Sequence, residues 1–258
     1  MSTQLTNKIN PHITLVGAGP GDIELITVKG LKALREAQVI LYDALVSEEL
    51  LDFAHPEAIK VYVGKRKAKH TYSQDKINKL IVSYAFQYGH VVRLKGGDSF
   101  VFGRGMEEIK YAESYGISTT VVPGISSSIG VPAVAGIPVT HRGISESFWV
   151  ITGTTSEGKL SEDVYDAVKT NATVVILMGV GKLQEIVEAY QWQGKGDLPI
   201  ALIQNGSLPN ERIALGTIDT IIDEVESRGV EAPAIIIAGE VVSLHPWYEI
   251  VAVAQANT

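Results

Sequence analysis

The feature that most constrains this 258-residue chain is a repeated alternation of short apolar segments with longer amphipathic ones. In the first half, the apolar segments are rich in Val and Ile: HITLVG, QVILYD, KVYVGK and HVVRLK. Amphipathic segments such as QDKINKLIVSYAFQYG separate them and have a helical pattern. Strands that alternate with helices form sheets that helices cover on both faces. The sequence therefore predicts an α/β fold.

A second series of such segments starts near Ser145. Between the two series lies GIPVTHRGIS, which is rich in turn-forming Gly and Pro. Domain boundaries fall in segments of this kind. We therefore predict two α/β domains. Residues 1–143 contain most of the glycine-rich loops, and residues 144–258 complete the ligand-binding site.

The composition excludes several classes of protein. The chain has no cysteine, which rules out disulfides and thiolate-bound metals, and its six histidines never pair at the i, i+4 spacing of a helical zinc site, so we expect no metal. A net charge of −7 disfavours nucleic acid, because phosphate binding needs an electropositive surface. Signal-peptide and bilayer-spanning apolar runs are missing from the sequence. We expect a cytoplasmic protein without nucleic-acid or membrane partners.

The glycine-rich segment GAGPGD, residues 17–22, follows the apolar segment ITLV and is typical of nucleotide binding. A dinucleotide fingerprint needs Gly where this chain has Asp22, because a side chain there disturbs helix packing and a carboxylate would face the pyrophosphate. Asp43, at the end of VILYD, nevertheless has the spacing of the ribose-binding acid of that fold. An NAD-dependent oxidoreductase and a purely structural turn therefore both stay open.

A more specific motif is RLKGGDSFVFGRGMEE, residues 93–108. Its glycines allow the backbone to approach a ligand closely, and Asp98, Arg104 and Glu107 bring together charges that a purely structural loop rarely collects. The alternative is that Glu107 and Glu108 only complement the positive end of a helix dipole, with Arg104 as their surface partner. We favour a loop that lines a site.

A third motif, VVPGISSS at residues 121–128, places hydroxyl groups where they either cap a helix or bind a ligand. With the three motifs and the segment THR at 140–142, the chain strongly resembles the tetrapyrrole methylase family, and within it the uroporphyrinogen-III C-methyltransferases. The resemblance extends from about Ile13 to Val242. Ser99 and Met106 depart from it, since Pro and Gly are frequent at these positions in the family.

The resemblance implies two α/β domains that hold S-adenosylmethionine (SAM) in the cleft between them, in a homodimer. It implies methylation of uroporphyrinogen III at C2 and C7, which gives precorrin-2 for sirohaem or cobalamin biosynthesis and S-adenosylhomocysteine (SAH) as the second product. By the same resemblance, the positions that contact the cofactor are Pro20, Gly96, Gly97, Asp98, Val101, Ser126, Ser127, Met178 and Gly206. From the residues alone, the default interpretation of Met178 is a core residue of a buried strand.

Methyl transfer from a sulfonium to carbon depends mainly on alignment in a dry cleft, and the positive charge left on the pyrrole is relieved by loss of a proton. By resemblance, Asp43 accepts a proton and Lys65 donates one. Arg104, Glu107 and Arg142 are candidate substrate or proton-transfer residues by the same resemblance. Read without it, Asp43 fits a turn or cap residue, and Lys65 fits a solvated loop.

The segment KRKAKH, residues 65–70, concentrates positive charge in an otherwise acidic chain. We hypothesise that it steers the substrate, which carries eight carboxylates, although a solvated loop or a nucleic-acid patch has the same pattern. Only 12 residues precede Ile13, so we expect a monofunctional methylase without an appended dehydrogenase–ferrochelatase region. The alternatives are a sister methylase acting on a later corrinoid or another substrate, an NAD-dependent oxidoreductase and, last, a pure binding module.

Overall fold

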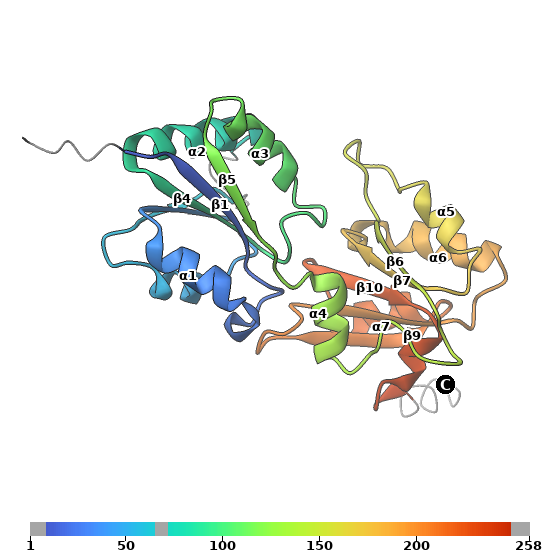
Figure 1. The fold of residues 1–258 in the computed structure, drawn as a ribbon. Helices are drawn as coiled ribbons and strands as arrows, with labels where there is room; N and C mark the ends of the chain where they lie inside the picture. Colours follow the sequence, from blue (N-terminus) through green and yellow to red (C-terminus); the bar gives the residue numbers. More distant parts are fainter. Residues whose placement is uncertain (1–8, 65–71, 249–258) are drawn as a thin grey trace, which may run out of the picture. The chain divides into compact units, whose positions relative to one another are not determined.

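The computed structural model describes residues 9–64 and 72–248. The chain divides into two compact units, residues 1–126 and 127–258, each built from one sheet and its helices (Figure 1). The predicted α/β fold is therefore confirmed. Within the described ranges, every helix is too short or too polar to cross a membrane.

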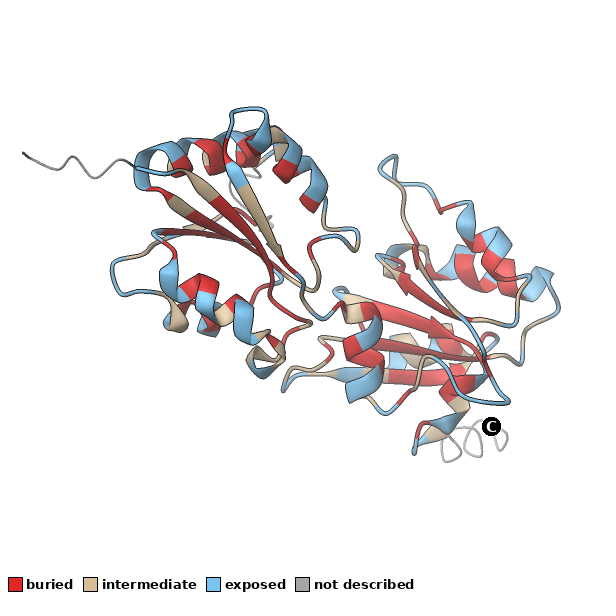
Figure 2. Cartoon of the chain, viewed as in Figure 1, coloured by how far each residue is buried: buried red, intermediate tan, exposed pale blue. Residues whose placement is uncertain are grey.

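The first unit contains a five-stranded sheet in the order β3-β2-β4-β1-β5, in which all neighbouring strands are parallel. Its central strands β2, β4 and β1 are nearly continuous runs of buried residues, as expected for a sheet covered on both faces, whereas the edge strands β3 and β5 are mostly of intermediate exposure (Figure 2). Their bounds are β1 His12–Gly17, β2 Val39–Tyr42, β3 Ile59–Tyr62, β4 His90–Lys95 and β5 Ser118–Val122.

Alternate residues of these strands pack against different helices. Ile13 and Leu15 contribute to the core beneath α2 (Gln74–Tyr88) and α3 (Gly105–Glu113). Val16 contributes to the core beneath α1 (Val28–Glu36) on the other face. Two 3-10 helices, η1 and η2, complete that second layer; they span Ile23–Leu25 and Glu48–Phe53.

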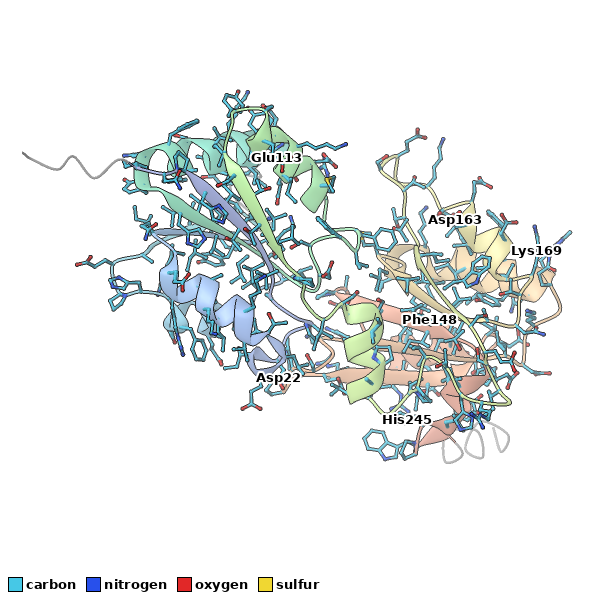
Figure 3. The ribbon with its side chains drawn as sticks, in the orientation of Figure 1. Asp22, Glu113, Phe148, Asp163, Lys169 and His245 are labelled. Carbon is cyan, nitrogen blue, oxygen red and sulfur yellow. The ribbon has the colours of Figure 1, made fainter. Side chains whose placement is uncertain are left out.

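The strand order contradicts the dinucleotide-binding hypothesis. In that fold the first strand lies beside the second, whereas here β4 separates β1 from β2. The segment after GAGPGD forms the 3-10 helix η1, and Asp22 caps it by accepting a hydrogen bond from the backbone N–H of Glu24 (2.9 Å; Asp22 is labelled in Figure 3). The carboxylate therefore already binds a backbone N–H group that a pyrophosphate would need as a donor.

The second unit contains a mixed sheet in the order β6-β7-β10-β8-β9. Only β6 and β7 pair in parallel; the pairs on either side of β10, and the pair β8–β9, are antiparallel. Consequently β6, β7 and β8 run in the same direction and end at the same edge. Their bounds are β6 Phe148–Thr152, β7 Thr173–Leu177, β8 Pro199–Gln204, β9 Arg212–Thr217 and β10 Ala234–Ala238.

Helices again cover both faces of this sheet. One face packs against three helices, α5 (Asp163–Ala167), α6 (Leu183–Trp192) and α7 (Ile221–Arg228). The other packs against α4 (Ser127–Val134) and the 3-10 helix η4 (Glu240–Leu244). A further 3-10 turn, η3, spans Val180–Lys182.

The division between the units falls between Ser126 and Ser127, so the boundary that we predicted at residue 143 lies inside the second unit. The physical reason is the packing of α4: Val131 and the following Ile137 belong to the same apolar cluster as Val175 of β7. The turn-rich segment GIPVTHRGIS therefore connects two elements of one unit rather than two domains.

Candidate functional site

Three loops of the first unit converge at the carboxyl ends of their strands. Gly19, in the loop after β1, and Gly97, in the loop after β4, exchange two backbone hydrogen bonds of 3.2 and 2.7 Å. The backbone N–H of Ala18 also donates to the carbonyl of Lys95 (2.7 Å). Gly124, in the loop after β5, lies against both: a Cβ on Gly17 would come within 2.5 Å of the Gly124 nitrogen. Gly17 and Gly124 therefore leave no room for a side chain where these segments meet.

Asp98 ties these loops together. One carboxylate oxygen accepts a hydrogen bond from the backbone N–H of Phe100 (2.8 Å), and the other accepts one from the N–H of Gly124 (3.0 Å). Gly96, two residues earlier, packs against the loop after β2, because a Cβ on it would lie 2.6 Å from the Cβ of Leu45. The predicted positions Gly96, Gly97 and Asp98 thus lie in one cluster of loops.

The end of this loop presents an exposed ion pair. Arg104 precedes α3 with φ of 57° and donates to both carboxylate oxygens of Glu107, at 2.8 and 2.6 Å. Both side chains are about half exposed, at 56% and 53%. The hydrogen bonds from Arg104 are the main reason that the pKa of Glu107 is lowered. The pair is accessible to a ligand, and its contribution to stability is small because solvent screens it.

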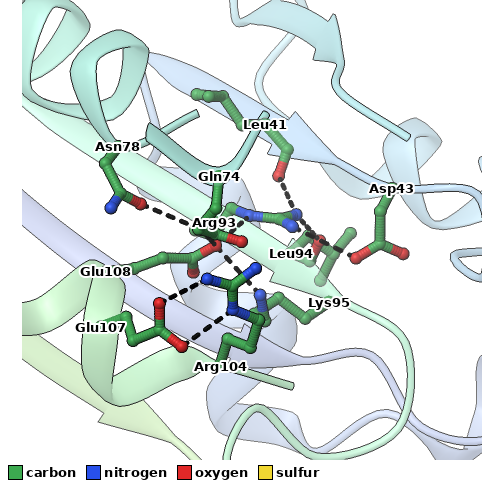
Figure 4. Close-up of polar contacts among 10 residues, drawn as sticks. All are labelled: Leu41, Asp43, Gln74, Asn78, Arg93, Leu94, Lys95, Arg104, Glu107 and Glu108. Atoms are coloured by element: carbon green, nitrogen blue, oxygen red, sulfur yellow. Dashed lines mark hydrogen bonds and ion pairs between the residues drawn. The ribbon is translucent and has the colours of Figure 1, made fainter. Parts of the chain in front are cut away.

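Asp43 belongs to a network of charged side chains between the sheet and helices α2 and α3 (Figure 4). The guanidinium of Arg93 donates from Nη2 to Asp43 (3.3 Å) and from Nε to Glu108 (3.3 Å). Its third nitrogen, Nη1, donates to the carbonyls of Leu94 (2.8 Å) and Leu41 (3.4 Å). All three nitrogens of this buried guanidinium are therefore bound.

The same Glu108 oxygen, Oε1, accepts two more hydrogen bonds, from Lys95 Nζ (3.1 Å) and from Gln74 Nε2 (3.1 Å). Glu108 is 2% exposed, and its Oε2 has no hydrogen-bond partner among the residues that the structure describes. Burial, together with the neighbouring Arg93, lowers the pKa of Lys95. The network places two buried cations and one buried carboxylate directly behind Asp43.

Sequence reasoning did not assign functions to Arg93, Lys95 or Glu108. The available signal was the presence of two cations at alternate positions of an otherwise apolar strand, which places them on one buried face. The two glutamates that we considered as complements of a helix dipole have different surroundings. Glu107 has the surface partner Arg104, whereas Glu108 is buried and bound to Arg93 and Lys95.

In the second unit, predicted positions lie at the edge where β7 and β8 end. Met178 directly follows β7, and Gly206 follows β8 after Asn205. The loop of Gly206 packs on α4, the helix that Ser127 opens, because a Cβ on Gly206 would overlap Val131. The structure therefore brings the start of α4 into the same unit as these two loops.

Met178 is held by the loop after β6. Its carbonyl accepts a hydrogen bond of 2.7 Å from the hydroxyl of Thr154. Beside this contact, a Cβ on Gly153 would lie 2.5 Å from Cα of Gly179. The side chain of Met178 is 54% exposed, so the core interpretation of this methionine is wrong.

Backbone strain is concentrated in these loops. In residues 9–64 and 72–248, the non-glycine residues with positive φ are Phe102, Arg104, Met178, Asn205 and Ser207. Each lies in the loop that leads to α3, after β7 or after β8. Because such conformations cost energy and gather at ligand-binding sites, their distribution supports the predicted loops.

The remaining predicted residues are placed as follows. Pro20 is half-buried in the loop after β1, Ser126 is buried at the end of the loop after β5, and Val101 donates its N–H to the carbonyl of Asp98 (3.3 Å). Arg142 is exposed in the loop between α4 and β6 of the second unit. Lys65 and the rest of the basic segment 65–70 lie outside the described residues.

Comparison with known proteins identifies the family to which the chain belongs. The family model described as Tetrapyrrole (Corrin/Porphyrin) Methylases matches residues 12–222. The chain belongs to this family. The matched range contains every residue that we predicted to act in catalysis or cofactor binding.

Relatives of this tetrapyrrole methylase match it over at least nine-tenths of the chain. The chain is 48% identical over 235 residues to the uroporphyrinogen-III C-methyltransferase of Methanocaldococcus jannaschii, covering 90% of this chain and 97% of that one. It is 44% identical to a siroheme synthase of Actinobacillus pleuropneumoniae, covering 93% of this chain and 49% of that longer protein.

Among solved structures, this methylase is similar to uroporphyrin-III C-methyl transferase from Thermus thermophilus complexed with S-adenyl homocysteine. The TM-score is 0.78 and the sequence identity 37%, and the match covers 90% of this chain and 99% of the other. The family resemblance and the two-domain α/β fold that we expected are thereby confirmed.

Proposed function

We propose that this methylase transfers methyl groups from SAM to C2 and C7 of uroporphyrinogen III, giving precorrin-2 and SAH. The observation that carries the proposal is the 48% identity, over nearly the whole length of both chains, to a relative that is named for this activity. The converging loops and the buried charges behind Asp43 support it.

The residues present fit the cofactor. Backbone groups of tightly packed glycine loops can approach a ligand closely, and in this structure the loops after β1, β4 and β5 have that character. Because both oxygens of Asp98 already bind backbone N–H groups, we infer that Asp98 acts mainly by fixing the backbone at Phe100 and Gly124. The other proposed contacts in the first unit are Pro20, Gly96, Val101 and Ser126, and those in the second are Ser127, Met178 and Gly206.

When bound, SAM supplies a methyl group on a sulfonium whose sulfur leaves as a thioether. The new carbon–carbon bond leaves positive charge on the pyrrole, and loss of one proton restores neutrality. Asp43 is the proposed acceptor: its side chain is 25% exposed, and Arg93 and the N–H of Leu45 hold its two oxygens. Lys65 remains the proposed proton donor.

The charge distribution supports a polyanionic substrate on the first unit. Residues 1–126 contain 15 of the 22 Lys and Arg residues and 13 Asp and Glu, whereas residues 127–258 contain 7 and 16. Arg104 and Arg142 are the proposed partners of substrate carboxylates, because a guanidinium binds a carboxylate with two parallel hydrogen bonds. Glu107 keeps the guanidinium of Arg104 oriented.

The test is an anaerobic assay of the purified chain with uroporphyrinogen III and methyl-labelled SAM. We expect label to enter the tetrapyrrole and the product mass to rise by two methyl groups. Retained SAH binding without transfer to uroporphyrinogen III would contradict the proposal and favour a sister methylase. Later corrinoids in parallel reactions would then identify its substrate.

We also propose that the chain works as a homodimer in the cytoplasm. The family resemblance supports the dimer, and the absence of cysteine is compatible with a reducing compartment. Light scattering after size-exclusion chromatography is expected to give twice the mass of the chain. A monomer at micromolar concentration would contradict the dimer.

A further inference from the structure

We propose that Glu108 is a positioning residue for Asp43 and acts through the guanidinium of Arg93. The inference rests on the proposed role of Asp43 as the proton acceptor, and it assigns a task to a buried charge that the proposed reaction does not otherwise use. Figure 4 shows the chain of contacts from Glu108 through Arg93 to Asp43.

The first argument is geometric. A guanidinium is planar, so fixing two of its nitrogens fixes the direction of the third. Glu108 binds Nε of Arg93, and the carbonyls of Leu94 and Leu41 bind Nη1. Nη2 is thereby aimed at Oδ2 of Asp43, which it meets at 3.3 Å. Glu108 is therefore the one charged group among the three acceptors that orient this guanidinium toward the proton acceptor.

The second argument is the balance of charge. Arg93 and Lys95 are 3% and 5% exposed, so each needs a counter-ion inside the protein. Glu108 contacts both cations through one oxygen. Without its charge, Asp43 would be the counter-ion left in this network, and the two cations would draw its carboxylate inward. Glu108 thus leaves Asp43 free to face a substrate.

The third argument is that a neutral side chain of the same shape would fill the position of Glu108 at a lower desolvation cost. Its Oε2 is buried without a hydrogen-bond partner among the described residues, which is unfavourable for a charged group. A glutamine would supply the same acceptor oxygen at Oε1 with less desolvation cost. The requirement for charge therefore lies in what Glu108 does to Arg93 and Asp43.

The main variant is Glu108→Gln, which keeps the shape and the Oε1 acceptor and removes the charge. Since a displacement of about 1 Å can cost a factor of about 100 in rate, we expect kcat for methyl transfer to fall about 10- to 100-fold with the KM for SAM and the Kd for SAH unchanged. Glu113→Gln is the matched control on the same helix; its exposed carboxylate binds Thr119 at 2.8 Å (Figure 3). A kcat within twofold of wild type for Glu108→Gln would overturn the proposal.

A second variant tests whether Glu108 positions Asp43 or serves only as a counter-ion of Lys95. The double variant Lys95→Met/Glu108→Gln removes one buried cation together with the carboxylate and leaves Arg93 balanced by Asp43. If Glu108 acts through Arg93, the double variant folds like wild type and stays slow. Recovery of wild-type kcat would show that Glu108 only neutralises Lys95, which overturns the proposal.

A measurement without substrate distinguishes this inference from the proposed function. Carbodiimide-coupled labelling of carboxylates, read by mass spectrometry, reports the accessibility of Asp43 directly. We expect labelling of Asp43 to fall several-fold in Glu108→Gln and to stay unchanged in Glu113→Gln. Unchanged labelling in both variants would overturn the positioning role whatever reaction the wild type catalyses.

Discussion

At the scale of single residues, His90 shows how its surroundings affect a titratable side chain; it lies at the amino end of β4, beside His12 at the amino end of the neighbouring strand β1. The His90 ring lies 2.8 Å from the hydroxyl of Thr14 through Nε2, and its centroid is 5.3 Å from that of His12. Burial, opposed in part by the carbonyl of Glu36 and assisted by His12, lowers the pKa of His90. The folded protein therefore favours neutral His90.

A depressed histidine pKa makes stability depend on pH with a definite sign. The unfolded chain binds a proton at His90 near pH 6.5, whereas the folded chain binds it only at lower pH, so unfolding becomes easier as pH falls below about 6.5. We expect His90→Gln to lose less unfolding free energy than wild type between pH 7 and pH 5. Urea unfolding at each pH checks this, and parallel losses in the two proteins would contradict it.

Glu107 and Glu108 show what sequence could not determine at this scale. They are adjacent and chemically identical, yet one is half exposed beside Arg104 and the other is buried beneath the sheet. The difference depends on the rotation of α3 about its axis, which long-range packing of residues such as Ile109 and Ala112 fixes. The motif predicted a candidate site, but the identity of the glutamate that contacts Arg93 required the structure.

At the scale of elements, the apolar pattern was sufficient to predict the strands, because most of them are short runs rich in branched apolar residues. Strand order was not predictable in this way: β4 lies between β1 and β2, a pairing of distant segments with no local signal. The boundary was misplaced for a related reason. The small residues of α4 gave little indication of which sheet they would cover, and packing of Val131 and Ile137 decided it.

The loop after β6 provides a prediction at the element scale. The Thr154 hydroxyl donates to the carbonyl of Met178 and so supports a residue whose φ is 55°. A hydrogen bond of this kind contributes about 0.5–1.5 kcal/mol, so we expect Thr154→Val to weaken SAH binding by about 2- to 10-fold. Thr154→Ser keeps the hydroxyl and should bind like wild type. Calorimetry that finds equal affinity for all three proteins would contradict this role.

For the whole molecule, the separation of charge between the two units is the relevant feature. The first unit carries a small excess of positive charge, whereas the second is strongly acidic. A polyanion approaching such a protein is steered toward the positive part, and salt screens the attraction. Four of the positive charges of the first unit, Lys65, Arg66, Lys67 and Lys69, belong to the basic segment 65–70, so the positive excess depends on that segment.

The steering hypothesis predicts an effect on substrate capture alone. Neutralising Lys67 and Lys69 to Gln is expected to raise the KM for uroporphyrinogen III several-fold and to leave SAH affinity unchanged, because the charges act on the polyanion. Lys29→Gln/Lys32→Gln, on the exposed side of α1, makes the same change in charge elsewhere on the first unit. Equal KM values for the two double variants would contradict local steering.

The central claim is that Asp43, held by Arg93, accepts the proton released by methyl transfer. The most direct test is the single-turnover rate of Asp43→Asn with labelled SAM and uroporphyrinogen III, alongside its Kd for SAH. General-base catalysis is worth about 100- to 10,000-fold, so we predict a loss of that order with SAH affinity unchanged. A rate within a few-fold of wild type would contradict the account.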